Sequence, residues 1–137
     1  MVETDAHEGP VYVAAEHALY FTSVPRDGRV AIRRLDLASR RVSTVREPAN
    51  GANGMTLGLD GRLVVCEQGS DHVYRFDPAS GDLDVVADTF DKPNGIAFSP
   101  DEAVLYVTDS GANQEQGLGR RVERDSSDPL IRPPAVG

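Results

Sequence analysis

The feature that most constrains this chain is a short segment that reads turn, strand, turn, strand and recurs along the sequence. Its clearest copy begins with Asn94 and a glycine, followed by the apolar run Ile96–Phe98, a turn, and the β-branched run Val104–Thr108. Two further copies begin upstream, at Glu8 and Asn53. The three lead residues are separated by roughly 40 to 45 positions, which is the period of a four-stranded propeller blade.

The repeat predicts an all-β chain that forms part of a β-propeller. We expect a lead-in over residues 1–7, blades over residues 8–48 and 49–91, an incomplete blade over residues 92–112, and an irregular tail over residues 113–137. The tail carries arginines and prolines and no alternating apolar pair of strands. About two and a half blades result, whereas propellers hide their sheet edges by closing a ring of at least about four.

Composition limits the partners of the chain. Its 22 acidic and 14 basic side chains give a net charge of −8, which argues against nucleic acid or an anionic membrane and favours metal ions or neutral substrates. The single cysteine, Cys66, excludes an internal disulfide and is expected to be a small buried side chain. No stretch approaches the roughly 18 apolar residues of a membrane span, and the N-terminus has no apolar signal sequence. We therefore expect a cytoplasmic protein.

Oxygen-bearing side chains occupy two equivalent positions in each repeat. The innermost strand of a blade begins at the same end of the propeller at which its second strand ends, so both positions face one axial site. The first position is held by Glu8, Asn53 and Asn94, and the second by Thr22–Ser23, Glu67–Gln68 and Asp109–Ser110. Carboxylate and amide oxygens suit Ca²⁺, Mg²⁺ or Mn²⁺ and also accept Zn²⁺.

Each of these residues also has a purely structural interpretation. Asn53 and Asn94 precede glycines at turns, where asparagine tolerates left-handed backbone and bonds its own main chain. Glu8 is interpretable as a solvated carboxylate at a strand start. Glu67 and Asp109 are interpretable as loop residues that bond nearby amides. These alternatives stay open from the sequence.

Other catalytic patterns are missing from the sequence. There is no Gly-x-Ser-x-Gly nucleophile elbow and no phosphate-binding glycine loop. His7, His17 and His72 are not at the spacing of a zinc site.

Three motifs in order resemble the gluconolactonase/regucalcin (senescence-marker-protein) family of six-bladed lactonase propellers. The opening 8–11 resembles the first blade of that family. Residues 52–57 followed by 64–67 resemble the second blade of its bacterial gluconolactonase branch, and residues 93–102 resemble a mid-ring blade. The resemblance covers residues 8 to about 112 and implies the propeller fold.

The resemblance also implies an activity. Family members are metal-dependent hydrolases of sugar lactones, so a small sugar lactone is the expected partner and a divalent ion the expected cofactor, Ca²⁺ first, with Zn²⁺, Mg²⁺ or Mn²⁺ as alternatives. Glu8 and Asn94 match two of the three protein metal ligands of the family. Asn53 matches an asparagine at the sugar pocket, and Glu67 and Asp109 are further substrate-binding candidates because of their position.

The chain also departs from the family pattern. The third metal ligand is an aspartate that helps to activate water. It comes from a later blade that has no counterpart here, so the catalytic residue is unknown. A blade that precedes the Pro-Asn-Gly blade is also missing, because the sequence passes directly from Asp88 to Lys92 and Asn94. We expect a truncated or rearranged member with impaired activity. The alternatives are a non-catalytic propeller-repeat binding or scaffold module, self-associating through open blade edges, and an inactive gene fragment.

Overall fold

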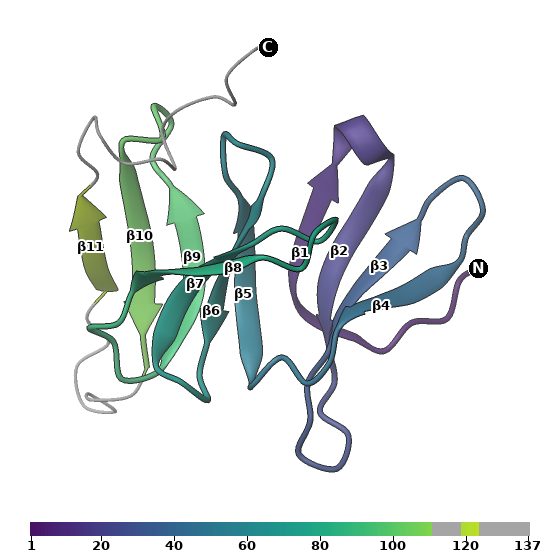
Figure 1. The fold of residues 1–137 in the computed structure, drawn as a ribbon, viewed down its shortest axis with the longest axis horizontal. Helices are drawn as coiled ribbons and strands as arrows, with labels where there is room; N and C mark the ends of the chain where they lie inside the picture. The colour runs from purple at the N-terminus through teal and green to yellow at the C-terminus, as the bar shows by residue number, and fades with distance from the viewer. Residues whose placement is uncertain (111–118, 124–137) are drawn as a thin grey trace.

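The chain folds into three antiparallel β-sheets, which confirms the all-β prediction. The computed structural model describes residues 1–110 and 119–123 (Figure 1). Within these residues the only helix is the short 3-10 turn η1 (Ala14–Glu16).

Each sheet is a meander in which strands adjacent in sequence pair with one another. The first sheet contains β1 (Ala6–Val13), β2 (Ala18–Ser23), β3 (Ile32–Asp36) and β4 (Val42–Arg46). The second contains β5 (Ala52–Leu57), β6 (Leu63–Glu67), β7 (His72–Phe76) and β8 (Leu83–Ala87). The third contains β9 (Pro93–Phe98), β10 (Val104–Asp109) and β11 (Gly119–Glu123).

The sheets stand side by side, with the second between the first and the third (Figure 1). The first strands of neighbouring sheets contact each other, β1 against β5 and β5 against β9. These three strands are therefore the innermost strands of adjacent blades around a common axis. The described residues form a partial β-propeller, as the repeat predicts.

Two apolar cores hold the sheets together, one on each side of the second sheet. The first core joins Val11, Val13, Ala18, Tyr20, Val30 and Ile32 to Met55, Leu63, Val65, Tyr74 and Phe76. The second joins Val64, Cys66 and Val73 to Phe90, Leu105 and Val107. Strand β6 contributes to both cores and all five of its residues are buried, which explains why its sequence is apolar throughout rather than alternating.

The third sheet differs from the sequence prediction. An irregular tail was expected from residue 113, and this prediction is wrong over Gly119–Glu123, which form β11 and pair with β10 from Thr108 to Val104. The edge of β10 offers unpaired backbone groups, and backbone pairing does not require an alternating apolar pattern in the added strand. Residues 111–118 and 124–137 of the predicted blade and tail lie outside the described residues.

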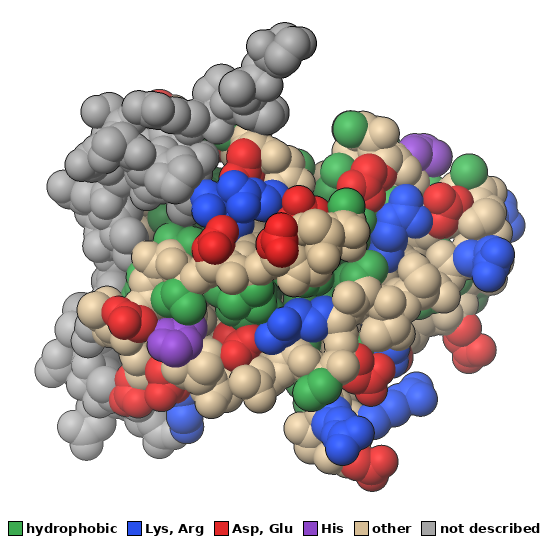
Figure 2. Space-filling model, viewed as in Figure 1, with side chains coloured by type: hydrophobic (Ala, Val, Ile, Leu, Met, Phe, Trp, Pro, Cys, Tyr) green, Lys and Arg blue, Asp and Glu red, His purple; other side chains and the backbone are tan. Residues whose placement is uncertain are grey.

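Acidic and basic side chains are interspersed over the face seen in Figure 2. No helix in the described part of the chain has the length and apolar character needed to cross a membrane.

Candidate functional site

The three lead residues lie at the start of the three inner strands. Glu8 is in β1, Asn53 in β5 and Asn94 in β9, and a glycine follows each of them. A Cβ atom on Gly9 would lie 2.6 Å from the carbonyl oxygen of Asn53. A Cβ atom on Gly54 would lie 2.2 Å from the carbonyl oxygen of Asn94. Because these positions have no side chain, neighbouring inner strands meet backbone to backbone, and the lead residues of the three blades come together.

The structure places the second predicted set of residues at the same end of the blades. Strand pairing sets Thr22 opposite Glu8, Glu67 opposite Ala52, and Asp109 opposite Pro93. We call this end, where β1, β5 and β9 begin, the leading end. The hydroxyl of the fully buried Thr22 lies 3.0 Å from the carbonyl oxygen of Glu8 and 3.4 Å from that of Asn53, which ties the first two blades together.

The turn interpretation of the two asparagines is wrong. Asn53 and Asn94 lie inside strands, and neither is among the described non-glycine residues with a positive φ. Three residues before Asn53, Asn50 adopts the left-handed conformation instead, with a φ of 49°. The side-chain oxygen Oδ1 of Asn53 is buried and has no hydrogen-bond partner in the structure. A buried acceptor of this kind is uncommon and is suited to a bound cation or a hydroxyl donor.

Glu67 and Asp109 are buried carboxylates that bond the segment approaching the inner strand of their own blade. Glu67 is 4% exposed, and its Oε1 accepts a hydrogen bond from Nδ2 of Asn50 at 3.1 Å. Asp109 is 8% exposed and accepts the backbone N–H groups of Asp91 and Lys92 at 3.0 and 2.9 Å. Both residues bond nearby amides, as the structural interpretation expected, but they end strands β6 and β10 and do not lie in loops.

A cation and an aromatic ring lie beside Glu67. Arg46 Nη2 is 3.6 Å from Oε2 of Glu67, and its guanidinium lies 5.3 Å from the ring centroid of Tyr74. Burial raises the pKa of the Tyr74 hydroxyl, and the negative charge of Glu67 raises it further. Tyr74 therefore stays protonated at neutral pH and is not a base.

Cys66 is the small buried side chain that the sequence predicted. It is fully buried in the second core, and burial raises the pKa of its thiol to about 12. A thiol with this pKa is not an effective nucleophile at neutral pH.

The lead residues offer one carboxylate and two amide oxygens. This is a hard-oxygen donor set that fits Ca²⁺, Mg²⁺ or Mn²⁺, and one of the two amide oxygens, Oδ1 of Asn53, has no hydrogen-bond partner in the structure. No three His, Cys, Asp or Glu side chains of the described residues come together as a metal-binding group. Among the three lead residues, Glu8 carries the only negative charge.

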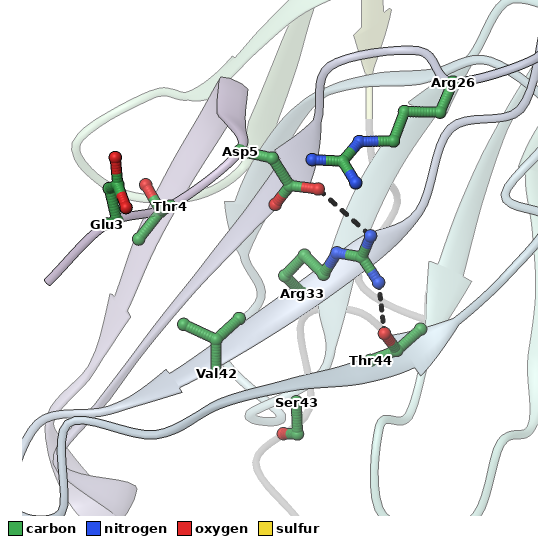
Figure 3. Close-up of a pocket in the computed structure, with 8 residues that line it drawn as sticks. All are labelled: Glu3, Thr4, Asp5, Arg26, Arg33, Val42, Ser43 and Thr44. Carbon is green, nitrogen blue, oxygen red and sulfur yellow. Dashed lines mark hydrogen bonds and ion pairs between the residues drawn. The ribbon is translucent and has the colours of Figure 1, made fainter.

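The cavity in Figure 3 belongs to a different part of the first blade. It has a volume of about 580 Å³ and lies between the lead-in and strands β3 and β4. Asp5 and Arg33 point toward each other inside it and form an ion pair of 3.0 Å, and Arg33 also donates to Thr44. The cavity is lined by two acidic side chains, Glu3 and Asp5, and two basic ones, Arg26 and Arg33, so its charges balance. We assign the cavity a structural role, in which the lead-in is fixed to the blade.

Sequence reasoning did not identify the glycines of the site as functional. Gly9 and Gly54 are the positions that allow adjacent blades to approach, and a signal for them was present, because a glycine follows each lead residue in all three repeats.

Comparisons with known proteins agree with this fold. The family model described as SMP-30/Gluconolactonase/LRE-like region matches residues 6–89 and 68–116. Lactonohydrolase oryH of Aspergillus oryzae is 48% identical over 52 residues, which are 38% of this chain and 11% of the relative. The gluconolactonase of Zymomonas mobilis is 31% identical over 120 residues, which span 74% of this chain and 32% of the relative.

Solved structures give the same result. A crystal structure of a candidate gluconolactonase superposes with a TM-score of 0.69 at 25% identity, covering 90% of this chain and 47% of that chain. The gluconolactonase XC5397 of Xanthomonas campestris gives a TM-score of 0.67 at 22% identity and covers 79% and 36%, respectively. The chain thus spans about half or less of these relatives. Because the family model matches most of its residues, the chain belongs to the SMP-30/gluconolactonase/LRE-like family.

Proposed function

We propose that this chain contributes to the metal-dependent hydrolysis of a sugar lactone. In this proposal Glu8 and Asn94 bind a divalent ion, Ca²⁺ first, and Asn53 orients the substrate. The third metal ligand and the group that activates water are not assigned to any described residue. The chain alone is therefore expected to bind the ion weakly and to turn over slowly.

The observation that carries the proposal is the backbone contact between neighbouring inner strands. There is no room for a side chain where Gly9 meets Asn53 and where Gly54 meets Asn94. These backbone contacts bring the three lead residues from three blades to one end. A fold that needed these strands only as scaffold would not require an oxygen-bearing residue at each start. Family membership and the names of the lactone-hydrolysing relatives support the same assignment.

The described residues supply binding and orientation. A bound divalent ion polarises the lactone carbonyl and so favours attack by water at that carbon. The Glu8 carboxylate and the Asn94 amide oxygen would hold the ion at the leading end. Oδ1 of Asn53, which is buried and unpartnered, would accept a hydrogen bond from a hydroxyl group of the sugar ring.

A hydrolysis assay tests the proposal. Turnover of a sugar δ-lactone is followed by acid release, with and without millimolar Ca²⁺, for wild type, Glu8→Gln and Asn94→Ala. We expect ion-dependent turnover that falls at least about tenfold in both variants, which is the effect of losing one good charge-assisted contact. Asp101→Ala is the matched control, because Asp101 bonds Ser99 and Ala103 at the other end of the β9–β10 hairpin.

Two results would oppose the proposal. Ion-independent turnover that survives both substitutions would place the chemistry elsewhere. A folded chain with neither turnover nor ion binding would favour the binding or scaffold module. Light scattering on the same samples tests the predicted self-association through open blade edges.

A further inference from the structure

We infer that Asp109 is a positioning residue, which fixes the approach to β9 and thereby sets the orientation of Asn94. The inference rests on the function proposed above, in which Asn94 is a metal ligand. It gives Asp109 a role other than direct contact with the substrate.

Asp109 and Ser110 form hydrogen bonds with Asp91 and Lys92, the two residues immediately before β9. Oδ2 and Oδ1 of Asp109 accept the backbone N–H groups of Asp91 and Lys92. Ser110 then donates its own N–H to the carbonyl oxygen of Lys92 at 2.9 Å and its hydroxyl to the same oxygen at 3.1 Å. These four hydrogen bonds join segments that lie 17 and 18 residues apart in the sequence.

The contacts bracket Asn94 on both sides. Pro93, which precedes Asn94, is buried and has no N–H of its own to donate. After Asn94, the N–H of Gly95 donates to Oγ1 of Thr108 in β10 at 2.7 Å. The backbone is thus fixed to β10 immediately before and after Asn94, and Asp109 supplies the fixed point on the N-terminal side.

The second blade repeats the arrangement around Asn53. Glu67 stands where Asp109 stands, and it accepts a hydrogen bond from the side chain of Asn50. Gly69 and Gln68 donate their N–H groups to the carbonyl oxygens of Asn50 and Gly51 at 2.8 and 3.2 Å. A buried carboxylate therefore holds the approach segment in both blades whose lead residue is an asparagine.

The expected size of the effect follows from known metal sites. Hydrogen bonds from backbone N–H groups to a carboxylate are about twice as strong as neutral ones. Residues that orient a metal ligand without touching the metal typically change the affinity about 10- to 100-fold when they are replaced. Loss of Asp109 should therefore weaken ion binding without removing a ligand.

Nuclear magnetic resonance on the full chain tests the inference with Mn²⁺ as the probe ion. The variants are Asp109→Ala, Asp109→Asn and Asn94→Ala, with Asp101→Ala as control. For Asp109→Ala we expect hydrogen exchange of the Asp91 and Lys92 amide protons to accelerate at least about tenfold. We also expect that about 10- to 100-fold more Mn²⁺ is needed to broaden the Asn94 side-chain signals by half. Asp109→Asn keeps one acceptor and should fall between, whereas the control should match wild type.

Several outcomes would overturn the inference. Unchanged exchange at Asp91 and Lys92 would show that Asp109 does not hold the segment. Faster exchange with unchanged Mn²⁺ binding would reduce Asp109 to a structural residue. If Mn²⁺ does not affect Asn94 in wild type, the proposed metal site fails. In that case the orientation of Asn94 is tested without metal, by the signals of its side-chain amide. These should be one sharp pair in wild type and broadened or doubled in Asp109→Ala. Equal signals in the two proteins would overturn the inference.

Discussion

The two ends of the blades use the same residue types for different purposes. At the leading end, a Cβ atom on Gly54 would lie 2.2 Å from the Asn94 carbonyl oxygen of the next blade. At the opposite end, which we call the trailing end, Gly61 lies in the β5–β6 turn with a φ of +78°, and a Cβ atom there would meet nothing within 4 Å. Gly54 is needed for packing between blades, and Gly61 for a local backbone conformation.

Carboxylates show the same difference. At the leading end, Asp109 and Glu67 accept hydrogen bonds from residues 17 to 18 positions away in sequence. At the trailing end, Asp60, Asp77 and Asp101 each accept a backbone N–H from a residue two positions later. These trailing-end turn contacts are local, with one longer ion pair of 3.6 Å from Asp60 to Arg75 in the same blade, whereas the two leading-end carboxylates bond segments distant in sequence. Only the leading end is expected to respond to changes in how the blades are packed.

The largest expected effect is on stability. Gly54→Ala should lower the free energy of unfolding by about 2 to 3 kcal/mol, because its methyl group overlaps the backbone of β9. Gly61→Ala should cost only about 1 kcal/mol, because the side chain has space and only the left-handed conformation is unfavourable. Urea denaturation of both variants measures the difference. Equal losses would remove the distinction between the two ends.

A smaller effect is expected on the reactivity of Cys66. The thiol is buried between the second and third sheets, with Sγ 4.0 Å from the Gly95 carbonyl oxygen, and burial raises its pKa to about 12. Gly54→Ala should loosen this interface and raise the rate of modification by a thiol reagent at pH 7 about tenfold, which corresponds to about 1.4 kcal/mol of easier opening.

The same reagent applied to Gly61→Ala sharpens the comparison. This variant should react nearly as slowly as wild type if Cys66 becomes exposed by separation of the blades. Acceleration of each variant in proportion to its own loss of global stability, which is about fivefold for the roughly 1 kcal/mol expected of Gly61→Ala, would show instead that Cys66 reacts only after global unfolding.

The smallest effect concerns pH. A hydrogen bond from Arg33 holds the pKa of Asp5 below its usual value of 3.8, across 28 residues of sequence. Because the folded-state pKa is the lower one, this stabilisation is present above pH 3.8 and is lost as the pH falls through the folded-state pKa. Asp5→Asn should therefore be less stable than wild type at pH 7, by less than about 1 kcal/mol, and the difference should shrink as the pH falls through the folded-state pKa of Asp5.

A local turn carboxylate provides the control for this measurement. The pKa of Asp36 is lowered mainly by the backbone N–H of Ser39, three residues later. Thermal unfolding of Asp5→Asn and Asp36→Asn over pH 3 to 7 compares a carboxylate that joins distant segments with one that caps its own turn. A pH-independent difference between Asp5→Asn and wild type would contradict the assigned ion pair.

Several features could be predicted from local sequence because they depend on local chemistry. Turn residues and β-branched runs located the hairpins, and the repeat period identified four-stranded blades. The buried state of Cys66 followed from its apolar neighbours. The turn interpretation of Asn53 and Asn94 failed because an Asn-Gly pair is also compatible with a strand when the glycine lies against a neighbouring segment, which is the backbone of Asn94 for Gly54 and the side chain of Thr108 for Gly95. Strand β11 was missed because edge pairing depends on a free neighbouring strand, which its own sequence does not reveal.

The sequence by itself determined the class of fold, the order of the strands and the oxygen-bearing residue types at the lead positions. Only the tertiary structure decided which of these residues come together and which hydrogen bonds they make. It placed Glu8, Asn53 and Asn94 at one end through the backbone contacts at Gly9 and Gly54. It also showed that the Asp109 carboxylate accepts the backbone N–H groups of Asp91 and Lys92. The physical reason is that strand and turn propensities act over a few neighbouring residues, whereas these contacts join segments about 18 to 45 positions apart, and their geometry exists only once the blades are packed.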